Sequence, residues 1–556
     1  MNSSNDIQKA RNHTAVHTDQ KHKQPPHHQL SKVWFDSGEN AVAEAINKSK
    51  SINNTKGAAK NIILFIGDGM GVSTVTAARI LAGQQLGLQG EEFQLSFDKF
   101  PFSGLAKTYN TNQQTPDSAG TMTAIMIGVK TKAGVIGLDE NITPGNCQSM
   151  KKAAANLAAN KIRLSALELA EMSGKATGIV STARITHATP AATYAKSPDR
   201  DWEDISKLPK AAITAGCLDI ADQLIHFESR LKALVGSSRK VSNIDGIDLI
   251  LGGGRRHFLR HLEADNSRDT NKPIEGNRTD NRNLVSEWKT LYPTGQYIID
   301  KTGFDAIDPA KTNKLLGLFD ESHMHYEADR DNDKLGEPSL TEMTQKAIDI
   351  LDNDKDGFFL MIEAGRIDHG HHAGSAYNAL TDTIELSKAV QVAVDATSTK
   401  DTLIIVTADH SHVFTIGGYP TRGNPILGKV IENDRHGNPQ FEPALAEDGL
   451  PYTTVAYRNG RGFKNLEHET DANVAYNKAI NAGRKDLTEI DTTLSGYHQE
   501  SLVPRSAETH GAEDVAIYAS GPGAHLISGT NEQNIIFHVM NYAADLVGKS
   551  HLKTAN

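Results

Sequence analysis

Three segments of this chain end an apolar run with carboxylate or imidazole side chains. Asp68 follows the first of these runs, Glu363 follows the second, and Asp409 with His410 follows the third. Carboxylates and imidazoles gathered at strand ends are the ligands that a site with several metal ions needs. The three segments therefore predict one shared metal site.

The second segment also holds a dense group of histidines. Asp368 and His372 are four positions apart, so on one helical turn both side chains face the same way, as two ligands of one ion must. A charged, solvated helix start would show the same spacing. The density of imidazoles, with His369 and His371 beside Glu363, favours the metal site.

A serine between the first two segments is placed to act as a nucleophile. Ser118 opens the run Ser-Ala-Gly-Thr-Met-Thr, which predicts a helix start at this residue. Serine is a strong N-cap, so capping alone would explain it. A helix N-terminus also stabilises an anion, and a serine beside a divalent metal can lose its proton and attack phosphorus. Metal ligands together with this serine predict phosphoryl transfer.

Several isolated polar residues complete the candidate site. His187 and Thr189 follow another apolar run and could serve an oxygen-preferring ion. Arg200 could hold two phosphate oxygens with its planar guanidinium group. His510 is a further candidate ligand, and His412 is a candidate for the shell outside the ligands. Taken alone, each of these residues would be an ordinary surface or core residue.

The elements that must position these residues alternate along the chain. Apolar, β-branched runs predict strands at 61–66, 176–180, 247–251, 358–362, 402–406 and 515–518. Helix-like stretches lie at 152–157, 165–172 and 377–394. This alternation predicts an α/β fold with a central, mostly parallel sheet that helices bury on both faces. Ligands of such sheets bind beyond the carboxyl ends of the strands.

Three regions depart from this alternation. Residues 1–31 are rich in Asn, Gln, Lys and His and predict a disordered tail, which leaves 32–550 for the folded domain. Residues 253–345 are rich in Asn, Asp, Arg and Lys, and residues 413–508 in Gly, Pro and Asn. Because the last region falls between two groups of candidate ligands, we interpret it as an insertion into the main domain.

The bulk composition fits a soluble globular enzyme. A chain of 556 residues predicts one large domain with insertions, or two to three domains. A net charge of −10 argues against nucleic acid as a partner, and no apolar run is long enough to span a membrane. The polar start has no signal-peptide core, which predicts either a cytosolic protein or a mature or engineered form. Cys147 and Cys217 are compatible with two free cytosolic thiols or with an exported disulfide.

Together, these segments resemble the alkaline phosphatase family over residues 61–543. The motifs occur in the family's order: Gly-Asp-Gly, Asp-Ser-Ala, His-Ala-Thr-Pro, Gly-Arg-Ile-Asp-His-Gly-His-His and Thr-Ala-Asp-His-Ser-His. The residues of these motifs are more similar to those of the animal branch of the family than to those of the enteric bacterial branch. The resemblance implies that Ser118 is the nucleophile and that Arg200 binds phosphate.

The resemblance also implies two zinc ions and one magnesium ion. The first zinc would be held by Asp368, His372 and His510, and the second by Asp68, Asp409, His410 and, during turnover, Ser118. Magnesium would be held by Asp68, Thr189 and Glu363, with His187, His369 and His412 outside the ligands. His187 and His369 stand where the enteric branch has an aspartate and a lysine, which leaves more of the magnesium shell to water. An additional calcium site of the animal branch is suggested at Phe319, Asp320 and Glu337.

Fold, assembly and location follow from the same resemblance. It implies a homodimer, a crown-like interface region at 413–508, a disulfide between Cys147 and Cys217, and a periplasmic or extracellular location. The implied reaction is hydrolysis of phosphate monoesters to an alcohol and inorganic phosphate through a phosphoserine intermediate.

Two other functions remain to be weighed against this hypothesis. A related metal hydrolase could act on diesters or sulfates, but sulfatases need a Cys/Ser-x-Pro-x-Arg setting that the sequence around Ser118 lacks. Relatives acting on diesters commonly use threonine and lack the arginine. A metal-binding or storage protein would need the metal ligands, but it would not need Ser118 and Arg200 together.

Overall fold

The fold was analysed in a computed structural model. It describes residues 55–154, 164–236, 241–268, 270, 272–475 and 479–550, which belong to one compact unit. The tail predicted at 1–31 and part of the helix predicted at 152–157 lie outside the described residues. None of the described helices is long and apolar enough to cross a membrane.

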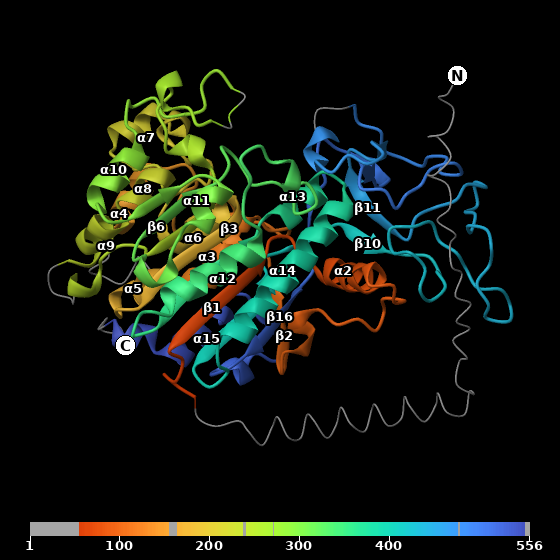
Figure 1. The fold of residues 1–556 in the computed structure, drawn as a ribbon, viewed down its shortest axis with the longest axis horizontal. Coiled ribbons are helices and arrows are strands. Elements are labelled where there is room, and N and C mark those ends of the chain that lie inside the picture. The colour runs from red at the N-terminus through yellow and green to blue at the C-terminus, as the bar shows by residue number, and fades with distance from the viewer. Residues whose placement is uncertain are drawn as a thin grey trace, which may run out of the picture. The chain divides into compact units, whose positions relative to one another are not determined.

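A ten-stranded sheet forms the centre of this unit, in the order β17-β2-β16-β8-β1-β7-β3-β4-β6-β5 (Figure 1). The strands are β1 (Asn61–Gly67), β2 (Phe102–Lys107), β3 (Ala176–Arg184), β4 (Leu249–Gly253), β5 (Gln296–Ile298), β6 (Leu315–Leu318), β7 (Phe358–Ala364), β8 (Thr402–Ala408), β16 (Val515–Ser520) and β17 (Thr530–Glu532). Strand β16 runs antiparallel to both of its neighbours, and every other pairing in the sheet is parallel. The predicted α/β fold with a mostly parallel sheet is confirmed.

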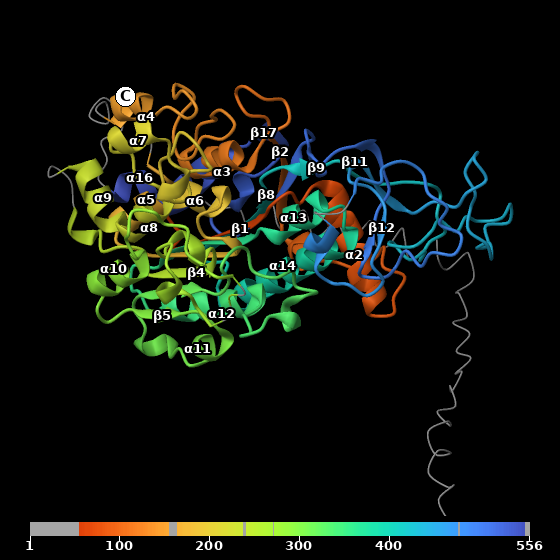
Figure 2. The same cartoon turned by 90° about the horizontal axis from the view of Figure 1, so that it is seen from above.

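Helices cover the sheet on both faces. On one face lie α2 (Val72–Gln85), α12 (Leu340–Leu351) and α14 (Ala376–Ala396), and on the other α3 (Ser118–Ile127), α5 (Ala166–Met172), α6 (Ala188–Tyr194) and α15 (Ile535–Ala544). Figure 2 shows the sheet between these two layers. Further helices are α4 (Cys147–Ala154), α7 (Lys210–Thr214), α8 (Ile220–Ile225), α9 (Phe227–Val235), α10 (Leu284–Leu291), α11 (Lys301–Asp305), α13 (Arg366–His372) and α16 (Leu546–Lys549).

Burial explains why the central strands could be found in the sequence. Every residue of β1, β7 and β8 is buried, because each strand has a neighbour on both sides and helices on both faces. Such strands carry continuous apolar runs rather than an alternating pattern.

The composition of 253–345 was misleading about the sheet. This region was expected to interrupt the alternation, yet it contributes β5 and β6, which complete one side of the central sheet. Both strands are short, and the polar segments around them hide their apolar residues.

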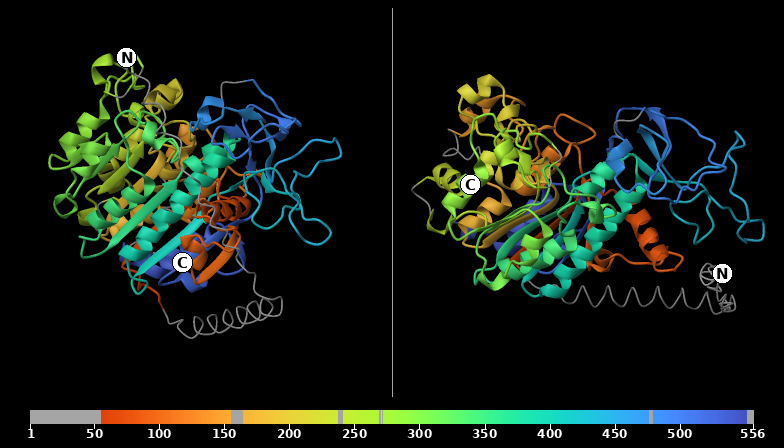
Figure 3. Two further views of the ribbon diagram at one scale, coloured as in Figure 1. Left: turned by 45° about the vertical axis from the view of Figure 1, so that its right-hand side comes forward. Right: turned by 45° about the horizontal axis from the view of Figure 1, so that its top comes forward.

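Residues 413–508 contain a separate small sheet. Its strands β10 (Phe414–Ile416), β11 (Val455–Gly460) and β14 (Ser501–Pro504) pair in that order, and β12 (Lys464–Asn465) pairs with β13 (Tyr497–His498). Figure 3 shows these strands and their long connecting loops beside α2 and α14. A short pair of strands, β9 (Ser411–His412) and β15 (His510–Gly511), closes the two ends of the region. We name residues 413–508 the inserted region.

Candidate active site

Strand register brings the first group of carboxylates together. The last residue of β1, Gly67, is level with Ala364 of β7 and Ala408 of β8. Asp68 and Asp409, each the next residue after its strand, therefore leave the sheet side by side. Parallel strands end at one edge of the sheet, so their following residues share one site.

Helix α3 presents Ser118 to these carboxylates. The residue that caps the helix is Asp117, not Ser118 as the sequence suggested: the Asp117 carboxylate accepts a hydrogen bond from the Gly120 N–H at 3.1 Å. Because Asp117 has taken over the cap, the Ser118 hydroxyl is free to point elsewhere. Its Oγ lies 3.0 Å from His410 Nε2 and 3.4 Å from Asp68 Oδ1.

Hydrogen-bond donors fix the carboxylate of Asp409. Its carboxylate accepts hydrogen bonds from the Gly69 N–H at 3.0 Å and the Thr121 hydroxyl at 3.2 Å. His410 Nε2 lies 3.3 Å from Asp68 Oδ1 and 3.4 Å from Asp409 Oδ2. The ligand atoms of Asp68, Asp409 and His410 are thus close enough for one ion.

A second group of ligands surrounds Asp368 at the start of α13. Its Oδ1 lies 2.8 Å from His412 Nε2, 3.3 Å from His372 Nε2 and 3.4 Å from His510 Nε2. The pairing of β9 with β15 sets His412 opposite His510, although the two are far apart in the sequence. His412, expected outside the ligands, is the histidine nearest to Asp368 in this structure.

Glu508 orients this second group, and sequence reasoning did not single it out. Its carboxylate lies 2.6 Å from His412 Nδ1, and its carbonyl oxygen lies 2.7 Å from His372 Nδ1. The only signal in the sequence was its position two residues before His510. Carboxylates and carbonyls in this role fix the tautomer of a ligating imidazole.

A third group contains Glu363 and Thr189. The Thr189 hydroxyl donates to Asp68 Oδ2 at 3.2 Å, and one oxygen of Glu363 accepts a hydrogen bond from the Ser181 hydroxyl. The other oxygen, Oε1, is buried without a hydrogen-bond partner. Asp68, His187 and Glu363 again offer ligand atoms close to one another.

Arg200 lies beside the serine and not among the ligands. Its guanidinium donates to Asp117 Oδ2 at 3.1 Å and lies 3.1 Å from His187 Nε2. Asp117 therefore holds both the start of α3 and the arginine. The structure contains the Cys147–Cys217 disulfide. It packs against Trp202, which lies two residues after Arg200 in the sequence.

Burial and neighbouring charges shift the pKa values of the carboxylates in this centre. Burial and the neighbouring carboxylates raise the pKa of Asp68 well above its usual value and that of Asp409 as well, and burial raises the pKa of Glu363 to about 7. For Asp368, burial is outweighed by the nearby imidazoles, chiefly His372, and the pKa is held well below its usual value. Four buried carboxylates with a free oxygen on Glu363 fit bound cations, since unpaired buried charges are unfavourable.

Comparison with known proteins identifies the family of this chain. The alkaline phosphatase family profile matches residues 59–546. The chain belongs to the alkaline phosphatase family. It is 42% identical over 515 residues to the tissue-nonspecific alkaline phosphatase of Rattus norvegicus, covering 92% of this chain and 88% of the relative. It is 41% identical to the alkaline phosphatase of Gadus morhua, covering 92% and 97% of the two chains.

Solved alkaline phosphatases share the fold. The enzyme from the Antarctic bacterium TAB5 covers 88% of this chain and 99% of its own, with a TM-score of 0.53 and 21% identity. The Thermus thermophilus enzyme gives a TM-score of 0.57 at 21% identity, covering 89% and 93%. The family is one of metal-dependent hydrolases, so this alkaline phosphatase is an enzyme, and the candidate ligand groups are consistent with its metal dependence.

Proposed function

We propose that this alkaline phosphatase hydrolyses phosphate monoesters through a phosphoserine formed on Ser118. The observation that carries the proposal is the position of Ser118 Oγ. It lies beside the ligand group of Asp68, Asp409 and His410, 3.0 Å from His410 Nε2, at a helix N-terminus whose cap also holds Arg200. Helix N-termini and arginine both favour a phosphate anion at this place.

The chain's own residues perform two displacements. Ser118 Oγ attacks phosphorus in line with the leaving oxygen, so a Ser–O–P bond forms while the ester P–O bond breaks; the serine hydroxyl gives its proton to solvent water, and the leaving alkoxide takes a proton from solvent water to become the alcohol. Water then attacks phosphorus, which releases inorganic phosphate and restores the serine. Arg200 binds two equatorial phosphate oxygens in both steps.

Two zinc ions and one magnesium ion are the proposed cofactors. The first zinc site would use Asp368, His372 and His510, with His412 nearby. The second zinc site would use Asp68, Asp409 and His410. Magnesium would use Asp68, Thr189 and Glu363. When bound, the ions supply positive charge that lowers the pKa of a hydroxyl group and stabilises phosphate oxygens. The imidazoles favour zinc and the oxygen ligands favour magnesium.

Replacement of Ser118 tests this function. The Ser118→Ala enzyme, metal-loaded and folded, should hydrolyse an aryl phosphate slower by orders of magnitude. The wild-type enzyme should prefer an aryl phosphate to a bis-aryl phosphate. Near-normal turnover in the variant would exclude Ser118 as the nucleophile, and a preference for the diester would favour the related diesterase function.

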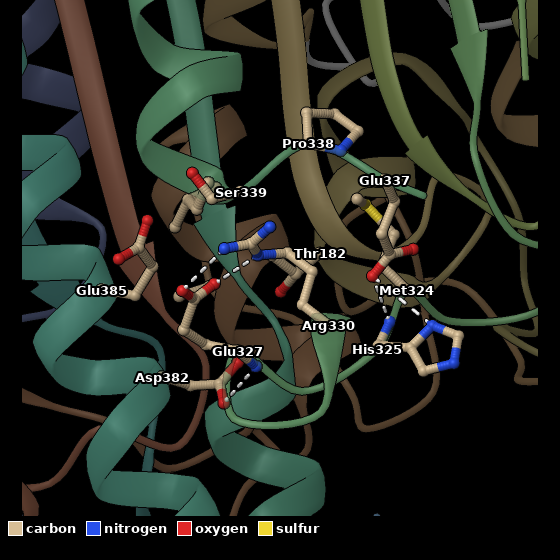
Figure 4. Close-up of a pocket in the computed structure, with 12 residues that line it drawn as sticks. Thr182, Met324, His325, Glu327, Arg330, Glu337, Pro338, Ser339, Asp382 and Glu385 are labelled. Atoms are coloured by element: carbon tan, nitrogen blue, oxygen red, sulfur yellow. Dashed lines mark hydrogen bonds and ion pairs between the residues drawn. The ribbon is translucent and has the colours of Figure 1, made fainter. Parts of the chain in front are cut away.

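A calcium ion at Phe319, Asp320 and Glu337 stays a prediction. In its support, Glu337 Oε2 is buried without a hydrogen-bond partner. However, His325 Nδ1 lies 3.5 Å from Glu337 Oε1 and 3.9 Å from Asp320 Oδ2, and Figure 4 shows this ring against Glu337. Despite burial, Glu337 and Asp320 raise the pKa of His325 to about 9, so an imidazolium already supplies positive charge there. Elemental analysis for calcium in purified enzyme decides whether this site holds a calcium ion or only the His325 imidazolium.

We also propose a homodimer that works outside the cytoplasm. The Cys147–Cys217 disulfide supports an oxidising compartment. The inserted region exposes large apolar side chains, with Tyr419 85%, Phe441 100% and Leu502 68% exposed, as expected of an interface. Sedimentation of the wild type and of Phe441→Asp tests the dimer, and a monomeric wild type would refute it.

A further inference from the structure

One buried arginine lies outside the proposed active centre. Arg366, the first residue of α13, is only 3% exposed, and its Nε is buried without a hydrogen-bond partner. Among the residues that the structure describes, no carboxylate forms an ion pair with its guanidinium. The group rests instead on the ring of Tyr326, with 3.7 Å between the guanidinium carbon and the ring centroid.

Asp382 interacts electrostatically with Arg366 but forms no ion pair with it among the described contacts. Asp382 is buried, and its Oδ2 accepts a hydrogen bond from the Glu327 N–H at 3.2 Å. Burial raises the pKa of Asp382 well above its usual value despite the opposing effect of the Arg366 charge, which makes Asp382 a weaker counter-charge for the arginine. A buried cation without a counter-charge is strongly unfavourable unless a ligand supplies that charge.

Arg366 opens into a cavity of about 350 Å³ that could hold such a ligand. The other lining residues are Ser322, His323, His369 and Asn473. Asn473, from the inserted region, is exposed at the mouth, and its side chain accepts a hydrogen bond from the Tyr326 hydroxyl at 3.2 Å. Small-molecule sites commonly measure roughly 300 to 1,000 Å³, so the cavity has room for a compact polar group.

The cavity adjoins the place where Arg200 would hold phosphate. The rings of His323 and His369 lie 4.0 Å apart, and the ring of His369 lies 5.6 Å from that of His187. His187 Nε2 in turn lies 3.1 Å from the Arg200 guanidinium. The imidazoles of His369 and His187 therefore link the cavity to the phosphate clamp.

We propose that this cavity is a second oxyanion subsite, in which Arg366 binds a phosphate group while a first phosphate occupies the active centre. The planar guanidinium can donate two parallel hydrogen bonds to such a group, and the side-chain amide of Asn473 can donate a further one. The second phosphate is either the distal group of a doubly phosphorylated substrate or free inorganic phosphate. The proposal rests on the function proposed above for the first phosphate.

Linear alkanediol bisphosphates with two to six carbons, each compared with its monophosphate, test the first source. In wild-type holoenzyme, the ratio of kcat/KM for bisphosphate over monophosphate should exceed the statistical factor of two and should peak at one linker length. In Arg366→Gln, the ratio should fall about tenfold toward that factor, and Arg366→Lys should retain part of it because lysine keeps the charge without the fork. Arg268→Gln, which removes an exposed arginine with a side chain 79% exposed, is the matched control and should keep the wild-type ratio.

Calorimetric titration of the holoenzyme with inorganic phosphate tests the second source. Wild type should bind two equivalents per chain and Arg366→Gln one. Asn473→Asp, a change at the exposed mouth that leaves the buried arginine in place, should weaken the second equivalent even if Arg366→Gln misfolds. Loss of the second equivalent without any bisphosphate preference assigns the subsite to free phosphate.

One phosphate per chain together with a ratio near two at every linker length would overturn the proposal. So would a bisphosphate preference that Arg366→Gln and Asn473→Asp leave intact. An enzyme that fails to hydrolyse aryl phosphate would refute the proposed function instead, and the phosphate stoichiometry would still report on this cavity.

Discussion

Arg200 is held from two sides, which makes it a preorganised partner for phosphate. Asp117 fixes one end of its guanidinium and His187 the other. Burial, with the Arg200 charge second, lowers the pKa of His187 to about 3, so this imidazole stays neutral and does not compete for the anion. A group fixed in this way can bind a phosphate without first reorganising.

Replacement of Arg200 should therefore separate monoesters from diesters. Arg200→Ser should weaken monoester hydrolysis and inhibition by inorganic phosphate roughly 10- to 1,000-fold, as expected for loss of a charged clamp, and should spare diesters more. Arg200→Lys should retain only part of the monoester hydrolysis and of the phosphate inhibition, because lysine keeps the positive charge but cannot donate two parallel hydrogen bonds as the guanidinium does. Kinetics on an aryl phosphate and a bis-aryl phosphate measure both effects, with the exposed Arg505→Ser as control. Unchanged phosphate inhibition in Arg200→Ser would contradict the clamp.

Glu508 is a positioning residue whose loss should loosen metal binding. Its side chain is 2% exposed and holds both His412 and the backbone N–H of Val413. Glu508→Gln should lower metal affinity roughly 10- to 100-fold, because the orientation of His412 is no longer fixed by a charged acceptor. Metal content after dialysis against graded chelator measures this, and exposed Glu489→Gln should behave as wild type. Rescue of activity by excess zinc would separate weaker binding from a damaged fold.

At the scale of the element, helix α3 connects packing with chemistry. A Cβ added at Gly120 would lie 2.5 Å from Asn110 Oδ1, and Asn110 donates a hydrogen bond to the Asp117 carboxylate at 2.9 Å. Glycine is thus required here by a close approach, not by an unusual backbone angle. Because Asn110 is hydrogen-bonded to Asp117, a shift of Asn110 should also move Asp117 and the start of the helix, where Ser118 lies.

Gly120→Ala should consequently damage stability and turnover together. Overpacking at such a site costs about 1–3 kcal/mol, and displacement of Asp117 should lower kcat for monoesters. Gly417→Ala is the matched control, because nothing lies within 4 Å of the added atom. Thermal unfolding and initial rates on both variants give the result. If Gly120→Ala proved as stable and active as Gly417→Ala, the packing argument would be wrong.

How far the elements were predictable depended on their burial. Strands such as β1 and β8 were found because double-sided burial forces a continuous apolar run. Strand β5, with three residues and a single neighbour, was missed because so short a segment carries no periodic signal. The candidate ligands were identified by residue type, whereas Glu508 was not assigned a role, because its importance depends on contacts made only in the folded chain.

On the scale of the whole molecule, the two ends of the sheet hold opposite kinds of ionic structure. The carboxyl ends carry acids and imidazoles that need cations. The amino ends of β3 and β4 carry a compensated network, in which the buried Glu171 accepts hydrogen bonds from the Gly246 N–H at 2.7 Å and the Thr177 hydroxyl at 2.9 Å. Lys314 lies 2.7 Å from Asp248 in the same network. This end contributes stability and has no direct part in the proposed chemistry.

Glu171 should make the folded state less stable at alkaline pH. Burial, followed by the nearby Asp248 carboxylate, raises its pKa to about 8 in the folded state, whereas the unfolded value is near the ordinary 4.5. Between these values the folded state binds more protons than the unfolded state, so the free energy of unfolding falls as pH rises and levels off above about 8. Between pH 7 and pH 9.5 the loss is on the order of 1 kcal/mol.

Glu171→Gln should remove this pH dependence, because the neutral amide mimics the protonated acid and its oxygen can still accept the backbone hydrogen bonds. The difference in Tm between Glu171→Gln and wild type, both metal-loaded, should therefore grow in favour of the variant from pH 7 to pH 9.5. Glu442→Gln, an exposed site in the inserted region, should show a difference that does not change with pH. A Glu171→Gln difference that stayed constant or shrank over this interval would mean that Glu171 is already ionised in the folded enzyme, with Lys314 holding its charge.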